Sequence, residues 1–175
     1  MLDSLRGRIL ATEPELLLAV GAVTFRVENS ERTRSALPCP ESEALIFTEL
    51  VVRADHLGLL GFARPEERSL YRRVTAVSGV GKRLALALLS ELSPEELAQC
   101  VSGEDENRLT RVSGIGKKTA SRLLLELKGH LDEFLPDPGR RGPDPGTEER
   151  PEREEALLAL GALGMNPAGA RRALE

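Results

Sequence analysis

Two stretches of the chain repeat one short pattern of glycines followed by a lysine. Residues 77–92 read VSGVGKRLALALLSEL and residues 112–127 read VSGIGKKTASRLLLEL, so ten of sixteen positions are identical. Glycine has no Cβ and adopts positive φ readily, so an external group can approach the backbone closely. Amides that begin a helix, with a lysine beside them, attract an anion such as a phosphate. The predicted chemistry is phosphate binding, carried out at two places.

Each copy must form a helical hairpin for this chemistry to work. The Leu-rich second half of each copy should begin a helix after the second glycine, with its unpaired N–H groups facing outward. The apolar residue between the glycines should turn inward and hold the two helices together. The candidate DNA-binding residues are the glycines, this apolar residue and the basic residues that follow: Gly79, Val80, Gly81, Lys82, Arg83, Gly114, Ile115, Gly116, Lys117, Lys118 and Arg122.

Other glycine-rich sites match these stretches less well. A nucleotide-binding P-loop needs a glycine five positions before the Gly-Lys pair, where this chain has Ala76 and Arg111. A dinucleotide fingerprint needs a third glycine and a preceding strand, and neither copy has them. A packing turn between helices explains one isolated Gly-x-Gly, but two copies with lysine in the same place favour a site that holds the DNA backbone without reading bases.

The residues before the hairpins alternate between apolar and polar positions. This pattern predicts five short strands over residues 5–10, 16–20, 23–27, 45–52 and 57–62. Five short strands in so short a segment are typical of a small barrel of the OB kind, and a small sandwich gives a similar pattern. The last two strands are separated by RADHLG, so Asp55 and His56 are expected near a hairpin tip.

From Pro65 onward the apolar period becomes helical. Pro65 is followed by two glutamates, and Ser93 to Glu96 form a capping box, so we expect four or five short helices over residues 65–135. Residues 136–151 hold eight Pro or Gly in sixteen positions, which predicts a flexible linker. The expected domains are residues 1–64, residues 65–135 and, after the linker, residues 152–175, whose two amphipathic helices are too few to bury a core alone.

Composition predicts a folded, soluble protein. The 175 residues are 41% apolar and 30% charged, with a net charge of −4. Residues 65–135 balance 11 basic and 11 acidic residues, whereas residues 1–64 have 7 and 9. The two cysteines, Cys39 and Cys100, lie far apart and predict neither a disulfide framework nor a zinc site. No segment resembles a signal peptide or a membrane span, so a cytosolic protein is expected.

The paired hairpins resemble helix-hairpin-helix motifs, and the order of parts resembles the RuvA family of bacterial Holliday junction branch migration proteins. The similarity is carried by MLDSLRGRI at the start, VVRADHLGLLGF at 51–62, both hairpins, and ALLALGALGMNP after the linker. It implies an α+β multidomain fold: an N-terminal OB-fold β-barrel, a central all-α double helix-hairpin-helix domain, a flexible linker, and a small UBA-like helical domain that here stops in the second of three helices.

The resemblance also implies a function. The function implied is that of a non-enzymatic scaffold that binds four-way junction DNA independently of sequence and holds it open and square, as a homotetramer or as an octamer of two tetramers. Such a scaffold recruits the RuvB ATPase for branch migration in homologous recombination, DNA repair and the SOS response, with RuvC as a further partner. ATP and Mg²⁺ are used by RuvB, so no cofactor of its own is expected, and the location implied is the bacterial cytoplasm, away from membranes.

Further site residues follow from the resemblance alone. The family has an acidic pin of two adjacent carboxylates at the junction centre, where this chain has Asp55 and, at the partner position, Ala54. A tetramer would present four carboxylates instead of eight, so repulsion of the DNA strands is expected to be weaker. The expected RuvB-binding residues are Leu157, Leu160, Leu163 and Met165.

Two other functions compete with this interpretation. Helix-hairpin-helix pairs also occur in glycosylases, ligases and nucleases, but His56 and His130 stand alone in the sequence and no catalytic constellation is evident. The barrel could instead bind single-stranded DNA, which requires exposed aromatic side chains for base stacking. The few aromatic residues fall mainly at apparent core positions, so both alternatives are less favoured.

Overall fold

The computed structural model describes residues 2–13, 15–52 and 57–135 of the chain. They belong to one compact unit, Met1–Leu135. The predictions for Ala54, Asp55 and His56, for the linker, and for residues 152–175 with their RuvB-binding leucines and Met165 lie outside the described residues.

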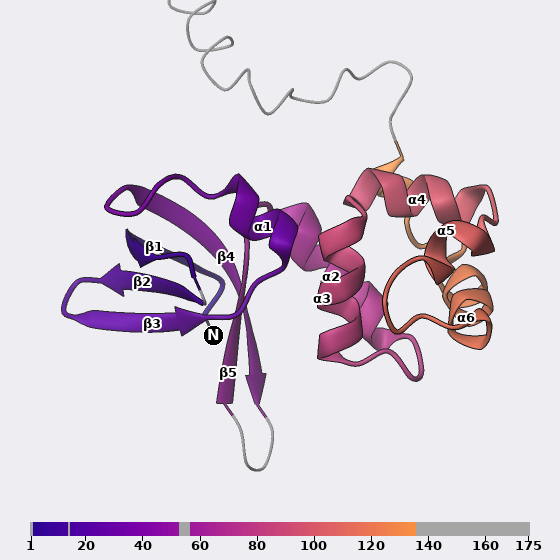
Figure 1. Ribbon diagram of the computed structural model, residues 1–175, viewed down its shortest axis with the longest axis horizontal. Helices are drawn as coiled ribbons and strands as arrows, with labels where there is room; N and C mark the ends of the chain where they lie inside the picture. The colour runs from indigo at the N-terminus through magenta and orange to yellow at the C-terminus, as the bar shows by residue number, and fades with distance from the viewer. Residues whose placement is uncertain (1, 14, 53–56, 136–175) are drawn as a thin grey trace, which may run out of the picture. The chain divides into compact units, whose positions relative to one another are not determined.

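Five antiparallel strands form the N-terminal half (Figure 1). They are β1 (Ser4–Ala11), β2 (Leu16–Val20), β3 (Val23–Val27), β4 (Glu43–Val52) and β5 (Leu57–Phe62), in the sheet order β3-β2-β1-β4-β5. Alternate residues such as Leu5 and Ile9 of β1 point into the core and are buried, because successive side chains of a strand face opposite sides of the sheet. All five predicted strands are confirmed.

The two edges of this sheet meet, which makes it a barrel. The Glu28 amide donates to the Leu59 carbonyl at 2.9 Å, and the Gly61 amide donates to the Glu28 carbonyl at 2.8 Å. These bonds form a parallel bridge between Glu28, directly after β3, and Leu60 of β5. Joining the edges satisfies backbone groups that an open sheet would leave unpaired. The structure therefore favours the barrel over the sandwich.

A short helix that the sequence analysis did not predict lies between β3 and β4. Helix α1 spans Glu31–Ala36, and the Ser30 side chain caps it by accepting from the Thr33 amide at 3.0 Å. Its six residues make fewer than two turns, too few to produce a helical apolar period. Only the serine cap could have indicated it.

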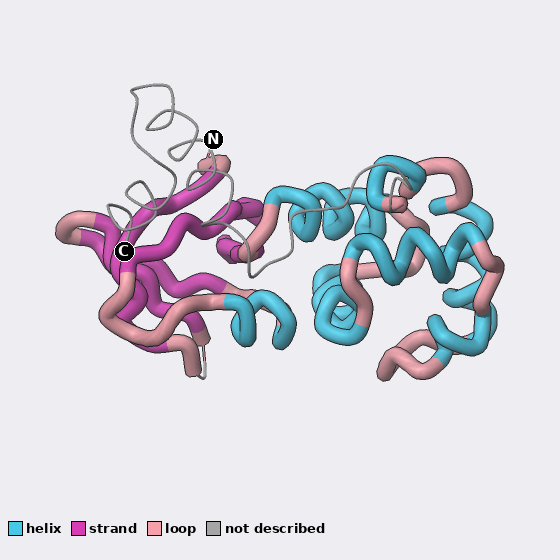
Figure 2. Tube along the Cα trace, turned by 90° about the horizontal axis from the view of Figure 1, so that it is seen from above, coloured by secondary structure: helices cyan, strands magenta, loops and turns pink. Residues whose placement is uncertain are grey.

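The C-terminal half of the described chain consists of helices α2 (Pro65–Ala76), α3 (Lys82–Glu91), α4 (Pro94–Ser102), α5 (Glu106–Thr110) and α6 (Lys117–Leu127), followed by a 3₁₀ turn, Asp132–Phe134. The prediction of four or five helices over 65–135 is confirmed. Strands and helices are segregated along the chain, as the magenta and cyan segments of Figure 2 show, with α1 the exception. Among the described residues, no helix is both long enough and apolar enough to cross a membrane.

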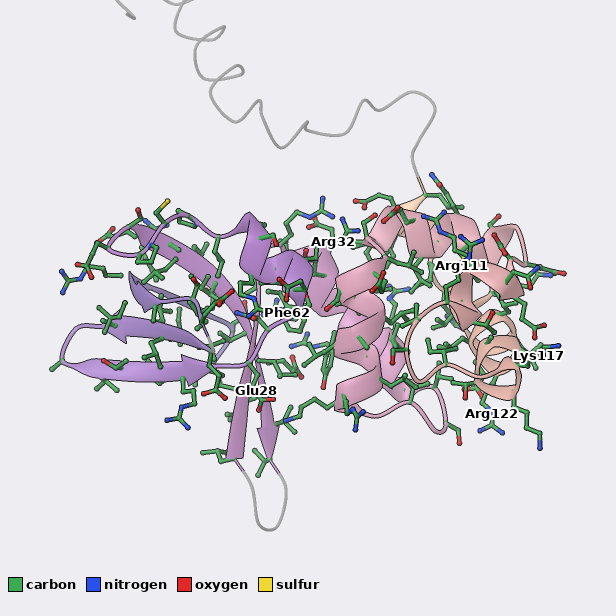
Figure 3. The ribbon with its side chains drawn as sticks, viewed as in Figure 1. Glu28, Arg32, Phe62, Arg111, Lys117 and Arg122 are labelled. Carbon is green, nitrogen blue, oxygen red and sulfur yellow. The ribbon has the colours of Figure 1, made fainter. Side chains whose placement is uncertain are left out.

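Strand β5 contributes to the core of the helical half. Leu60 and Phe62 are fully buried in the same apolar cluster as Leu70 and Val74 of α2 and Leu123 of α6. The ring centroids of Phe62 and Tyr71 lie 5.4 Å apart. The barrel therefore contributes β5 to the hydrophobic core of the hairpin helices, where Phe62 is labelled in Figure 3, while the barrel strands also enclose a second apolar cluster of their own.

The capping box of α4 also links the two halves. The Glu96 amide donates to the Ser93 hydroxyl at 3.1 Å, and the Ser93 amide donates to the Glu96 carboxylate at 2.8 Å. The same carboxylate accepts from Arg32 of α1 at 3.0 Å and from Arg108 of α5 at 2.8 Å. One side chain thus joins three helices.

Stability should depend on pH through Glu96. The hydrogen bond from the Ser93 amide, with the charges of Arg32 and Arg108, holds the pKa of Glu96 below its ordinary value of 4.5. A carboxylate whose pKa is lower in the folded state stabilises the fold above its unfolded pKa, and this contribution is lost as the pH falls. As the pH drops below 4.5, the stability of the wild type should therefore decrease more steeply than that of the E96Q variant. Urea denaturation at several pH values measures this, and parallel curves for the two proteins would contradict it.

Candidate nucleic-acid interface

The two repeated stretches fold into equivalent turns. The Val80 amide donates to the Val77 carbonyl at 3.0 Å, and the Ile115 amide donates to the Val112 carbonyl at the same distance. The third residue of each turn is a glycine with positive φ, 86° at Gly79 and 90° at Gly114. A turn with positive φ at its third position strongly favours glycine there. This requirement explains the first glycine of each copy.

The apolar residue between the glycines holds each hairpin closed, as predicted. Val80 and Ile115 are each only 5% exposed to solvent and belong to the helical core. Their burial fixes the turn against the two helices that it joins, so the amides that follow have a defined position.

The second glycine of each copy serves a different purpose from the first. Gly81 and Gly116 have φ of −92° and −87°, an extended conformation open to any residue, and they are the N-cap positions of α3 and α6. A Cβ added at either position would meet no atom within 4 Å. Neither conformation nor packing therefore requires glycine there. Its absence of a side chain leaves the backbone open to close approach from outside.

Helices α3 and α6 begin without a side-chain cap. Neither N-cap glycine can accept a hydrogen bond through a side chain. By contrast, Ser30, Ser93 and Asp105 cap α1, α4 and α5. The first N–H groups of a helix have no partner within the helix and carry its positive dipole end. The starts of α3 and α6 can therefore accept an external phosphate oxygen.

Basic side chains surround these helix starts unequally. Arg83, Lys117 and Lys118 are exposed, and none of them forms an ion pair with another residue in the described ranges. Lys117 and Arg122 both extend from α6 (Figure 3). Lys82 is different, because its Nζ lies 2.9 Å and 2.8 Å from the two carboxylate oxygens of Glu28. The second hairpin thus presents its lysines more freely than the first.

Arg122 connects the two hairpins. Its guanidinium donates to the Ser78 carbonyl at 3.0 Å, in the turn of the first hairpin. Glu126, one helical turn further along α6, accepts from the Ser78 amide at 3.4 Å and lies 3.8 Å from the Arg122 Nε. Arg122, predicted to bind DNA, therefore also orients the first turn against α6. Its side chain remains 50% exposed, which leaves donors free for an external partner.

A hollow lies between the start of α3 and the second turn. Its volume is about 360 Å³, and its lining includes Gly81, Arg83, Leu84, Ala87, Ser113 and Gly114. Residues from both repeated stretches therefore border one concave surface.

Glu28 is also part of the site, although no sequence pattern indicated it. Glu28 lies 54 positions from Lys82, beyond any local pattern, and only the barrel closure brings it to α3. Within the described ranges, no three His, Cys, Asp or Glu side chains form a group that could hold a metal ion.

Two family models match the chain over consecutive segments. The RuvA N terminal domain matches residues 1–61, and the SAM-like Helix-hairpin-helix tandem matches residues 71–128. The first segment contains all but the last residue of the barrel strands, and the second contains both turns with α3 and α6. The fold class predicted for the described part, an OB-fold barrel followed by a double helix-hairpin-helix domain, is confirmed.

Relatives from several bacteria align along nearly the whole chain, each named Holliday junction branch migration complex subunit RuvA. The protein of Alkalilimnicola ehrlichii is 42% identical over 182 residues, which cover 98% of this chain and 88% of the relative. That of Coxiella burnetii is 37% identical over 176 residues, covering 100% and 88%. That of Laribacter hongkongensis is 41% identical over 181 residues, covering 100% and 89%. Because relatives more than a third identical align from end to end, the chain belongs to the RuvA family.

Proposed function

We propose that this chain is a Holliday junction-binding scaffold of a branch migration complex. The observation that carries the proposal is the pair of equivalent turns, each opening an uncapped helix at an open glycine, in a member of the RuvA family. A helix start of this kind binds the phosphate backbone, which every DNA sequence shares. Recognition then depends on the shape of the junction.

Each hairpin holds the backbone through amides and nearby cations. In the first hairpin the groups are the amides after Gly81 and the Arg83 side chain. In the second they are the amides after Gly116 and the side chains of Lys117, Lys118 and Arg122. Because amide dipoles provide part of the attraction, binding is compatible with the net charge of −4. The hollow between the hairpins, bordered by Arg83 and Ser113, gives them one concave surface for a duplex arm.

The partners are also part of the proposal. Four copies assemble around one junction as a homotetramer, or eight as an octamer, with Asp55 at the centre beside Ala54. The leucines at 157, 160 and 163, with Met165, contact RuvB, which uses ATP and Mg²⁺, and RuvC joins the complex. The chain itself has no catalytic activity and needs no cofactor, and it acts in the bacterial cytoplasm in recombination and repair.

Junction preference is the test of this function. The full chain should bind a four-way junction at least about 100-fold more tightly than a linear duplex of equal length, since several arms are held at once and linked sites reinforce one another by about 10²–10⁴-fold. Fluorescence anisotropy with labelled DNA measures both affinities, and light scattering of the same samples gives the mass of the assembly. Equal affinities would refute junction recognition, and a complex containing a single chain would refute the scaffold.

A further inference from the structure

Two lysines at corresponding positions of the repeat have opposite surroundings. Lys82 and Lys117 are each the first residue of a hairpin's second helix. The Lys82 side chain is 24% exposed and lies within 2.9 Å of both oxygens of Glu28, whose side chain is 32% exposed. Lys117 is exposed and has no ion-pair partner among residues 2–13, 15–52 and 57–135. The repeat is therefore symmetric in sequence but not in charge.

Glu28 has a fixed backbone position at the barrel closure. Its amide and its carbonyl are both used in the bridge to β5, to Leu59 at 2.9 Å and from Gly61 at 2.8 Å. The backbone that carries its carboxylate is therefore fixed next to the start of α3, unlike the backbone of a residue on a free loop. A carboxylate near a helix N-terminus is also favoured by the helix dipole. The Glu28–Lys82 pair is thus built into the contact between barrel and hairpin.

Pairing with a carboxylate changes what a lysine contributes to DNA binding. A cation that neutralises a phosphate releases a counterion from the DNA, and each such contact makes binding more salt-dependent. A lysine already neutralised by a protein carboxylate gains little by meeting a phosphate, because it must first leave its partner. A half-buried pair is also screened by salt less than an exposed one. Lys82 and Lys117 should therefore differ in their effect on the salt dependence of binding.

We propose that Glu28 is a positioning residue that keeps the Lys82 ammonium away from the DNA backbone. The first hairpin then holds its phosphate through amides and Arg83, and the second hairpin supplies the larger share of the salt-dependent attraction. This inference rests on the proposed function. As a consequence, the second hairpin attracts the backbone of each duplex arm more strongly than the first hairpin does. The weaker attraction at the first hairpin lowers the energy needed for the DNA to slide past it.

The experiment compares the salt dependence of binding for five forms of the full chain: wild type, E28Q, K82Q, E28Q/K82Q and K117Q. Affinity for a four-way junction is measured from 50 to 200 mM KCl, and for a linear duplex as well. For each chain in contact with DNA, K117Q should make the negative slope of log K against log salt shallower by about 0.9, the value of one phosphate contact. K82Q should leave that slope unchanged.

Freeing Lys82 should have the opposite effect. E28Q should steepen the slope by about 0.9 per chain, equivalent to an additional loss of about 3.5-fold in affinity across this fourfold change in salt. In the E28Q/K82Q variant the slope should return to that of the wild type. Because the double variant has the net charge of the wild type, this reversal assigns the effect to Lys82 only together with the unchanged slope of K82Q, since a general charge effect would make the K82Q slope shallower.

A second Lys–Glu pair provides the matched control. Lys128 and Glu104 lie 2.6 Å apart, with side chains 63% and 65% exposed. Lys128 directly follows the 11 residues of α6, so it lies about 16 Å along the helix from the hairpin tip. E104Q removes the same charge as E28Q and should change the slope by less than about 0.3, a third of one phosphate contact.

Each outcome has a defined meaning. A K82Q slope reduced as much as that of K117Q would overturn the inference, and so would a steeper slope for E28Q that persists in E28Q/K82Q. If E28Q fails to fold by circular dichroism, the comparison of K82Q with K117Q decides alone. Equal binding of junction and linear duplex by the wild type would refute the proposed function instead. The slopes can still be compared on linear duplex in that case, so the two failures remain distinguishable.

Discussion

Junction binding should fall by at least about 100-fold when Gly81 and Gly116 are both replaced by Asp, while the folded state keeps its stability. Each carboxylate would occupy the space in front of a helix start, where the site is expected to hold a phosphate. Each hairpin would lose hydrogen bonds to a charged group worth about 1.5–3 kcal/mol, and two such losses give a factor of about 100 or more. Anisotropy titration against a four-way junction measures the effect.

The fold should tolerate this double substitution. Both glycines have extended φ and open space where the Cβ would be placed. Asp is also a preferred N-cap residue and a favourable charge at the start of a helix, so thermal stability should be equal or slightly higher. The control is Q99D/S102D, which adds the same charge at two exposed positions of α4, outside both hairpins. Normal binding by G81D/G116D would exclude the hairpin amides from the interface.

The largest loss of stability is expected from Phe62→Ala. Phe62 is fully buried at the contact between β5 and the helices, against the Tyr71 ring. Removing a buried Phe ring and leaving a cavity costs about 3–5 kcal/mol. Urea denaturation followed by circular dichroism measures this free energy. Because β5 belongs both to the barrel sheet and to this core, both halves should lose stability together.

Val23→Ala is the matched control for Phe62→Ala. Val23 begins β3 and is 55% exposed, so its truncation should change the free energy of unfolding by less than about 0.5 kcal/mol. A Phe62→Ala protein with a helical half as stable as that of the wild type would contradict the shared core. Separate unfolding transitions of strands and helices in the wild type would contradict it as well.

Local patterns predicted most of the fold and the central part of the site. The alternation of Leu16 and Leu18 with less buried neighbours follows directly from the pleat of a strand, and the Ser93–Glu96 capping box specifies a helix start within four residues. The two turns were predictable because their geometry requires glycine at Gly79 and Gly114. Such features require only short-range physics, so one sequence suffices to identify them.

Features that depend on distant contacts were not predictable in this way. Helix α1 is too short to have a period, and its Ser30 cap resembles any loop serine. The Lys82–Glu28 pair exists because the barrel closes through Glu28 and Leu60, which the strand pattern alone does not specify. The bond from Arg122 to Ser78 depends on how the hairpins pack, so its second role was not evident from a repeat in which the corresponding position is Ala87.

The packing of Phe62 into the helical core also bears on how such chains can be divided and recombined. A cut between residues 64 and 65, where the strand pattern gives way to the helical one, would leave an apolar surface on both fragments, because β5 and α2 cover each other there. The smallest unit that could be transplanted into another protein is therefore the whole of residues 1–135. A helical fragment beginning at residue 65 would carry both hairpin sequences but would lose the β5 side chains that complete their core.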